Sequence, residues 1–319
     1  MNHGLILLLA ALLITGASGA ESTAMRGPVS GYVFDSKSGS VRPVLGMPGS
    51  STLGESLPSG MAIGRASIST ERNFAIVSIG ESRTPAVLNL GDPLSEPVTI
   101  PGLAPGDYSV ALSPAGKAAA LLEAETGTIH IVERIASAPG VAAAVRVPGA
   151  SHPSRIAISD DGARLLVVTR DGDSDVLTLL DNGGNVLSST RLGDVAAAEF
   201  LFDSHDALVA DRGRRELLLT GAAGIRLLLD SSVLVEPVAV AASRHNRRAV
   251  VADAKSQAVV SVGLNGEAVL VTACPCEVSG LQRFQGNAVF LLTSASSKPM
   301  WVFDGDAASP RVVFVPVME

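Results

Sequence analysis

The feature that most constrains the fold is a repeated pair of short apolar segments joined by a tight turn. In a clear copy the first segment ends in serine, and the second begins about five residues later. Three copies are clear and three are weaker, and they span 66–69 with 73–78, 110–113 with 118–122, 156–159 with 164–168, 200–203 with 207–210, 238–241 with 248–251, and 281–284 with 288–292. Successive copies start about 38–46 residues apart, which indicates a repeat architecture.

Two further apolar segments follow the first pair in each repeat, as at 128–132 and 143–147. Each repeat therefore holds four short strands, and its length is that of a four-stranded propeller blade. No stretch combines a sustained 3.6-residue apolar period with helix caps, so helices between the strands are not predicted. The 32 glycines and 18 prolines cut the apolar sequence into pieces of strand length. We expect an all-β chain folded as a β-propeller.

One repeat is specific enough to suggest a family. It spans 156–171 and continues through 176–181, with Asp-Asp-Gly at 160–162 and Leu-Val-Val-Thr at 166–169. This unit resembles the YVTN-type bacterial β-propeller repeat, which has a Ser-Pro-Asp-Gly turn, a Tyr-Val-x-Asn strand and a third strand ending in aspartate. Ser-Pro-Ala-Gly at 113–116 keeps another part of that turn. The resemblance implies the fold and leaves the function open.

The repeats predict six full four-stranded blades, which span 61–103, 104–149, 150–193, 194–232, 233–273 and 274–318. An N-terminal hairpin, 31–35 with 41–46, adds two strands. Its Val-Phe-Asp at 33–35 is repeated at 302–304, so we interpret the hairpin as the third and fourth strands of a blade. A seven-sector ring is the favoured prediction, and six blades with a separate hairpin are the alternative. Residues 21–60 hold this hairpin and a Gly/Ser/Pro-rich linker, and 61–319 form the propeller blades.

Residues 1–20 are predicted to be an export signal. An unbroken apolar run at 5–14 is followed by small residues, with Ser18 and Ala20 at the −3 and −1 positions of a cleavage site. The run is too short to span a bilayer, and no later run approaches the roughly 18 residues required. Because residues 1–3 carry no lysine or arginine, an uncleaved anchor is the alternative. We expect a secreted bacterial protein, periplasmic or extracellular, without a membrane span once the signal is removed.

Charge and motifs exclude several classes of function. The net charge is −7, and the two arginine clusters, 212–215 and 244–248, are expected on opposite faces of the ring. Nucleic-acid binding therefore has no electrostatic support. The sequence has no Gly-x-Ser-x-Gly elbow, no His-Glu-x-x-His, no Walker loop and no haem-attachment motif. No catalytic residue and no resident cofactor or metal is predicted.

Three aspartates form the first part of a candidate ligand face. Asp171, Asp173 and Asp175 lie in a turn between the second and third strands of a blade, on the face that also carries the blade-to-blade connections. Alternating carboxylates suit a divalent cation with oxygen ligands. However, Val176 stands where a calcium loop needs glycine, and Asn182 stands at the twelfth position. A solvated hairpin tip is the plainer interpretation.

Three arginines occupy the equivalent turn of the next blade. Arg212, Arg214 and Arg215 are therefore expected on the same face as the aspartates. They can pair with those aspartates, hold an anionic ligand through bidentate bonds, or form ordinary exposed ion pairs. His152, in a blade-to-blade connection, belongs to the same face.

Cys274 and Cys276 are the only cysteines, and they lie in another blade-to-blade connection. In an exported protein such a pair usually ends oxidised. A local disulfide or two unbridged thiols is the favoured interpretation, and a redox-active pair and a soft-metal site are the alternatives. A Cys-x-Cys pair alone lacks the further ligands of a zinc site.

Two functional hypotheses follow. The first is an exported, non-catalytic β-propeller that binds a protein or a cell-envelope component, because a complete scaffold carries no catalytic motif and its loops vary. The second is a propeller hydrolase that uses the acidic and arginine-bearing turns at the channel mouth with a divalent cation, since some propellers that this chain resembles are lactonases. The innermost strands carry mostly Ala, Ser, Ile and Val, which favours binding.

Overall fold

The computed structural model describes residues 27–58, 60–92, 94–147, 153–265, 267–294 and 299–316. Every regular element in these ranges is a β-strand. Among the described residues no helix is long and apolar enough to cross a membrane. The predicted export signal and His152 lie outside the described ranges.

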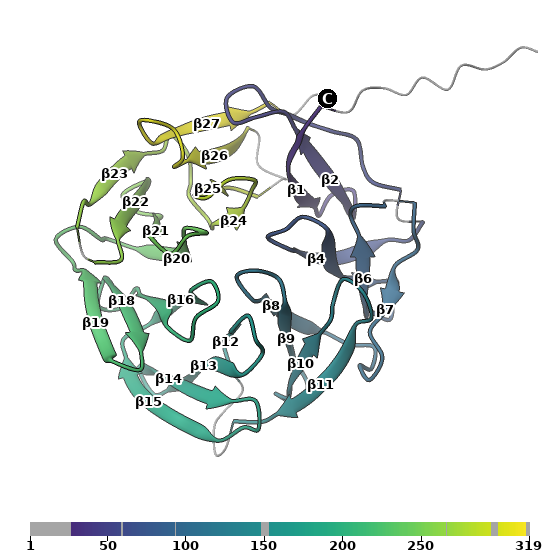
Figure 1. Ribbon diagram of the computed structural model, residues 1–319, viewed down its shortest axis with the longest axis horizontal. Coiled ribbons are helices and arrows are strands. Elements are labelled where there is room, and N and C mark those ends of the chain that lie inside the picture. The colour runs from purple at the N-terminus through teal and green to yellow at the C-terminus, as the bar shows by residue number, and fades with distance from the viewer. Residues whose placement is uncertain are drawn as a thin grey trace, which may run out of the picture.

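The strands form seven sheets arranged in a ring, which we number as blades 1 to 7 in chain order (Figure 1). Blades 2 to 7 have four strands each. Blade 2 consists of β4 (Ile63–Ile68), β5 (Phe74–Ile79), β6 (Thr84–Asn89) and β7 (Val98–Thr99), blade 3 of β8 (Tyr108–Leu112), β9 (Ala118–Glu123), β10 (Ile129–Glu133) and β11 (Gly140–Val145), and blade 4 of β12 (Arg155–Ile158), β13 (Arg164–Asp171), β14 (Ser174–Asp181) and β15 (Val186–Leu192). Blade 5 consists of β16 (Val195–Phe200), β17 (Ala207–Asp211), β18 (Glu216–Gly221) and β19 (Gly224–Leu229), blade 6 of β20 (Pro237–Ala242), β21 (Arg248–Asp253), β22 (Ala258–Gly263) and β23 (Leu270–Ala273), and blade 7 of β24 (Gln282–Arg283), β25 (Val289–Leu291), β26 (Met300–Asp304) and β27 (Arg311–Val315). Each of these sheets lies within one predicted repeat, and the prediction of an all-β propeller with seven sectors is confirmed.

Blade 1 is built from the N-terminal part of the described chain. Its strands are β1 (Val29–Asp35), β2 (Ser40–Leu45) and β3 (Thr52–Leu53), in that order across the sheet. The first two form the predicted hairpin, but they are not the third and fourth strands of a blade, because a further strand pairs with β2. The third lies inside the segment interpreted as a linker and pairs with β2. Blade 1 lies beside blade 7 in Figure 1, and each is a separate sheet, so side-chain packing brings the two ends of the ring together.

The core lies between neighbouring blades, because each blade buries apolar side chains on both faces. Between blades 3 and 4, for example, Ala120 and Ile131 pack with Val167 from the next sheet. Aromatic residues are only 3% of the chain, so alanine and branched aliphatic residues fill most of this space. Burying one large aliphatic side chain stabilises the fold by about 1.5–3 kcal/mol.

Candidate functional site

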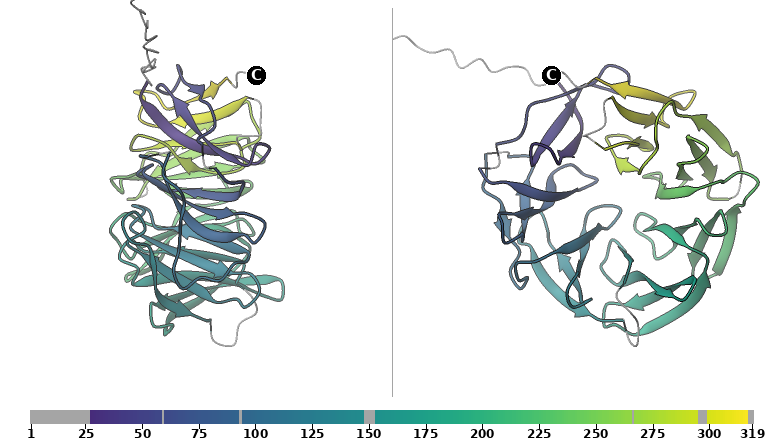
Figure 2. Two further views of the ribbon diagram at one scale, coloured as in Figure 1. Left: turned by 90° about the vertical axis from the view of Figure 1, so that its right-hand side faces the viewer. Right: turned by 180° about the vertical axis from the view of Figure 1, so that it is seen from behind.

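The predicted ligand face carries the second-to-third-strand turns and the blade-to-blade connections, and we call it the connection face. It is one of the two faces of the disc that Figure 2 shows edge-on. Asp171 and Asp173 are exposed at the β13–β14 turn of blade 4. Asp171 forms an ion pair with Arg191 of β15. Asp173 has no side-chain partner among the described residues.

Asp175 has a structural role at this face. Its side chain is only 6% exposed. One carboxylate oxygen accepts a hydrogen bond from the backbone N–H of Val195 at 2.7 Å, and the other lies 3.2 Å from Nη1 of Arg170. Asp175 therefore fixes the connection from blade 4 to blade 5 and cannot face a ligand together with Asp173.

Two of the three predicted arginines pair with nearby carboxylates, and the third has no side-chain partner among the described residues. Arg212 pairs with Asp194 at 2.7 Å, and Nε of Arg214 lies 3.6 Å from the buried carboxylate of Asp211. Arg215 is exposed and has no side-chain partner among the described residues. Its backbone has a positive φ of 59°, as a tight turn requires.

The structure brings the acidic and basic turns side by side, but it does not pair them with each other. Arg191 bridges them, because it pairs with Asp171 and its backbone oxygen accepts a hydrogen bond from Nη2 of Arg214 at 3.1 Å. Sequence reasoning missed Arg191 and Asp194. The signal was available, since both residues lie at the connection between the two blades that carry these turns. In the part of the chain that the structure describes, no three His, Cys, Asp or Glu side chains gather as metal ligands.

Cys274 and Cys276 are joined by a disulfide bond, with their Cα atoms 5.1 Å apart. Both side chains are buried against Val278 and Phe290 in the core between blades 6 and 7. The backbone N–H of Cys274 donates to the carbonyl of Gln257 at 2.7 Å. The bridge therefore holds the connection between these two blades, as the structural interpretation of the pair requires.

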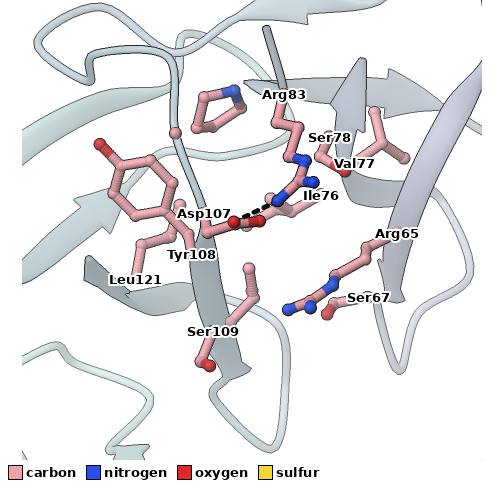
Figure 3. Close-up of a pocket in the computed structure, with 13 residues that line it drawn as sticks. Arg65, Ser67, Ile76, Val77, Ser78, Arg83, Asp107, Tyr108, Ser109 and Leu121 are labelled. Atoms are coloured by element: carbon pink, nitrogen blue, oxygen red, sulfur yellow. Dashed lines mark hydrogen bonds and ion pairs between the residues drawn. The ribbon is translucent and has the colours of Figure 1, made fainter. Parts of the chain in front are cut away.

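A pocket of about 270 Å³ opens between blades 2 and 3 (Figure 3). Its floor and walls are apolar, with the ring of Tyr108 and the side chains of Ile76 and Leu121. Its polar groups come from the inner strands β4 and β8, from β5, and from the connection between the blades. We call it the Arg65 pocket, after the arginine of β4 whose guanidinium points into it.

The Arg65 pocket carries a positive charge that no carboxylate in the pocket neutralises. Arg83 forms an ion pair with Asp107, the one acidic residue among its lining residues. Arg65 has no side-chain partner among the described residues. Burial and the nearby carboxylate of Glu123 raise the pKa of Tyr108, and its hydroxyl donates to the carbonyl of Ala104 at 3.0 Å. Tyr108 therefore stays neutral, and one positive charge remains.

Two serine hydroxyls complete the polar wall. They belong to Ser67 and Ser78, and neither has a side-chain hydrogen bond within the described ranges. Ser109 also borders the pocket, but its side chain leaves the other face of the sheet, where its register partner Leu122 packs between blades 3 and 4. Sequence reasoning missed all the polar residues of this pocket, because the innermost strands look uniformly small and apolar. The available signal was the few charged residues in those strands, such as Arg65 and Arg155.

No protein-family model matches this chain, and no curated protein matches it. Solved structures share its fold at low identity. A functionally unknown protein from Desulfotomaculum acetoxidans is 12% identical and has a TM-score of 0.62, with 91% of this chain and 100% of that one covered. The β-propeller domain of Cps50 (Swd1) from Myceliophteria thermophila is 12% identical, with a TM-score of 0.55 and coverage of 85% and 95%. Virginiamycin B lyase from Staphylococcus aureus is 10% identical, with a TM-score of 0.54 and coverage of 80% and 84%. At such identities the likeness extends to the fold alone, which is a seven-bladed β-propeller.

Proposed function

We propose that this protein is an exported, non-catalytic β-propeller that binds a protein or a cell-envelope component through the Arg65 pocket. The observation that carries the proposal is a hollow whose hydrogen-bond donors have no side-chain partner among the described residues: the guanidinium of Arg65 and the hydroxyls of Ser67 and Ser78. Exposed polar groups in a concave apolar site are the usual means of orienting a ligand.

The rest of the connection face supports this assignment by contrast. Asp171, Arg212 and Arg214 already have charged partners within the chain. The Arg65 pocket lies on the same face and keeps its donors available. A guanidinium and hydroxyl groups bind and position a partner well. Neither is a general base at neutral pH, because the guanidinium stays protonated.

The hydrolase alternative stays a prediction without a specific contact in its favour. Of its three carboxylates, Asp171 and Asp175 are paired with arginines, and only Asp173 is unpartnered within the described ranges. Hydrolysis of a lactone or ester with added calcium, lost on changing Asp173 to asparagine, would favour that alternative.

A steric block of the pocket tests the proposed function. Ser67→Phe fills the hollow without changing its charge, and Ser189→Phe places the same side chain at an exposed position of the outer strand β15. Both variants and the wild type are produced in the source bacterium, cross-linked in intact cells and captured from the envelope. We expect a specific partner with the wild type and Ser189→Phe but not with Ser67→Phe. Capture of the same partner by all three proteins, or of none by the wild type, would show the proposal to be wrong. Equal melting temperatures confirm that Ser67→Phe is folded.

A further inference from the structure

The Arg65 pocket has a polar wall that the fold places on one side. Arg65 and Ser67 are two residues apart on β4, so their side chains leave the same face of the sheet. Ser78 of β5 lies directly opposite Arg65 in the strand register. Tyr108 and Val110, on the inner strand of the next blade, face this set across the pocket. One guanidinium and two hydroxyls therefore converge on a single space.

A comparison within the molecule shows that Arg65 is unusual. Arg65, Ser109 and Arg155 each lie three residues before the end of an inner strand, so they occupy one level of three consecutive blades. Nε of Arg155 donates to the backbone carbonyl of Val195 in the next blade at 2.9 Å. Arg155 thus supports the packing of two blades. Arg65 has the same position in its blade and makes no such bond within the described residues.

The charged residues that line the pocket favour an anionic ligand. Arg65, Arg83 and Asp107 are the ionised groups that line the pocket, and the last two are paired with each other. The guanidinium of Arg65 presents up to five N–H donors in a fork that matches the oxygens of a carboxylate or a phosphate. A neutral or cationic group would leave these donors and their charge uncompensated.

The volume of the pocket and its apolar surface indicate what the remainder of the ligand is like. The pocket volume of about 270 Å³ is slightly below the roughly 300–1,000 Å³ of sites for drug-sized ligands. Val110 and Leu121 of blade 3 form an aliphatic wall opposite the polar one. The space therefore accommodates a small group, or the end of a larger molecule, that has an anionic head and a short apolar body.

We infer that the Arg65 pocket binds an oxyanion, a carboxylate or a phosphate, carried on a small aliphatic group. This inference rests on the proposed function and names the chemistry of the partner group that enters the pocket. Arg65 contacts the anion, Ser67 and Ser78 donate hydrogen bonds to it, and the aliphatic wall covers the apolar part. No bond is made or broken.

Titrations with small probes test this inference. Isovalerate, its neutral analogue isovaleramide, and propyl phosphate are each added at low ionic strength and followed by NMR. The proteins are the wild type, Arg65→Gln, and the matched control Arg247→Gln, which changes an exposed arginine without a side-chain partner among the described residues, on the opposite face. We expect the wild type and Arg247→Gln to bind the anions more tightly than the amide. Arg65→Gln should bind the anions at least about tenfold more weakly and the amide equally well.

The outcomes separate the inference from the proposed function. Tighter binding of isovalerate points to a carboxylate, tighter binding of propyl phosphate points to a phosphate, and either supports the inference. Equal binding of anion and amide, wild-type affinity in Arg65→Gln, or no binding of any probe would overturn it. If the probes fail but Ser67→Phe still loses its captured partner, partner binding stands without an anion. If the anions bind but the wild type captures nothing, anion binding in the Arg65 pocket is supported and the proposed binding of a protein or cell-envelope component is wrong.

Discussion

The serine that follows the first strand has the same structural role in four blades. Ser69, Ser113, Ser159 and Ser243 are each no more than 1% exposed. In every case the hydroxyl accepts a hydrogen bond from a backbone N–H at or near the start of the second strand. Because the repeated serine satisfies buried backbone donors, it is informative about the fold and carries no information about function.

Removing one of these hydroxyls should lower the free energy of unfolding. In Ser113→Ala the backbone N–H groups of Lys117 and Ala118 lose an acceptor at 3.0 and 3.1 Å. We expect the free energy of unfolding to fall by about 1–3 kcal/mol, the cost of an unsatisfied buried donor. Urea unfolding measures this, with the exposed Ser189→Ala as the control. Equal midpoints for the two variants would contradict the role given to the serine.

Among the elements, the turns between first and second strands are tied together across blades. The carboxylate of Asp160 in blade 4 accepts hydrogen bonds from the backbone N–H of Ala115 in blade 3 at 2.7 Å and of Asp203 in blade 5 at 2.8 Å. The neighbouring Asp161 lies 2.8 Å from Nε2 of His205, also in blade 5. These contacts hold three consecutive blades at the face opposite the Arg65 pocket.

The pair of Asp161 and His205 predicts a loss of stability in acid. Partial burial raises the pKa of Asp161, but hydrogen bonds from Ser159 and Ala163 and the proximity of His205 outweigh it and lower the pKa from 3.8 to about 2. The folded state therefore favours the ionised form, and its contribution is present above about pH 4 and lost as the pH falls toward 2. Urea unfolding from pH 2 to 5 should show a stability difference between the wild type and Asp161→Asn that shrinks with falling pH. A difference that is constant over this range would refute the assignment.

Strands with continuous apolar runs could be predicted, and short outer strands could not. The second strand β13 has five consecutive buried residues, which make it recognisable without a partner. By contrast, β3 and β7 have two residues each, and both residues of β7 are exposed. Their extended conformation depends on pairing with a neighbouring strand. Residues 52–53 therefore looked like part of a linker.

The candidate site could not be predicted for a related reason. Arg65 and Tyr108 belong to different repeats, and only the packing of blade 2 on blade 3 brings them to one pocket. The aspartates 171, 173 and 175 looked like a cluster because they are close in sequence. Their partners Arg191 and Val195 lie in other strands, and these partners decide which carboxylates are available.

At the scale of the whole molecule, the ring closes through side-chain packing between blades 1 and 7. Phe284 lies in the core with Val33 and Met300. Gly31 leaves room for that ring, since a Cβ there would lie 2.4 Å from a ring carbon of Phe284. The backbone N–H of Gln285 also donates to the carbonyl of Ser30 at 2.6 Å. Closure protects the faces of the two terminal blades from solvent.

Truncating Phe284 should weaken this closure. The side chain is 2% exposed, so Phe284→Ala leaves a cavity and should lower the free energy of unfolding by about 3–5 kcal/mol. Phe314→Ala, at a position that is 55% exposed on β27, is the matched control and should change stability little. Chemical unfolding compares the two, and limited proteolysis should cleave Phe284→Ala faster. Similar losses in both variants would mean that the ring does not close through Phe284.

The central claim is that this propeller is an exported binding protein, and native mass spectrometry of the protein isolated from its own cell tests it most directly. The account predicts a mature chain that begins near Glu21 and carries a bound partner or ligand mass, and that Ser67→Phe has the same mature chain without it. A chain that keeps residues 1–20 would contradict cleavage of the export signal. A wild type whose bound mass is absent, or is unchanged in Ser67→Phe, would contradict binding through the Arg65 pocket.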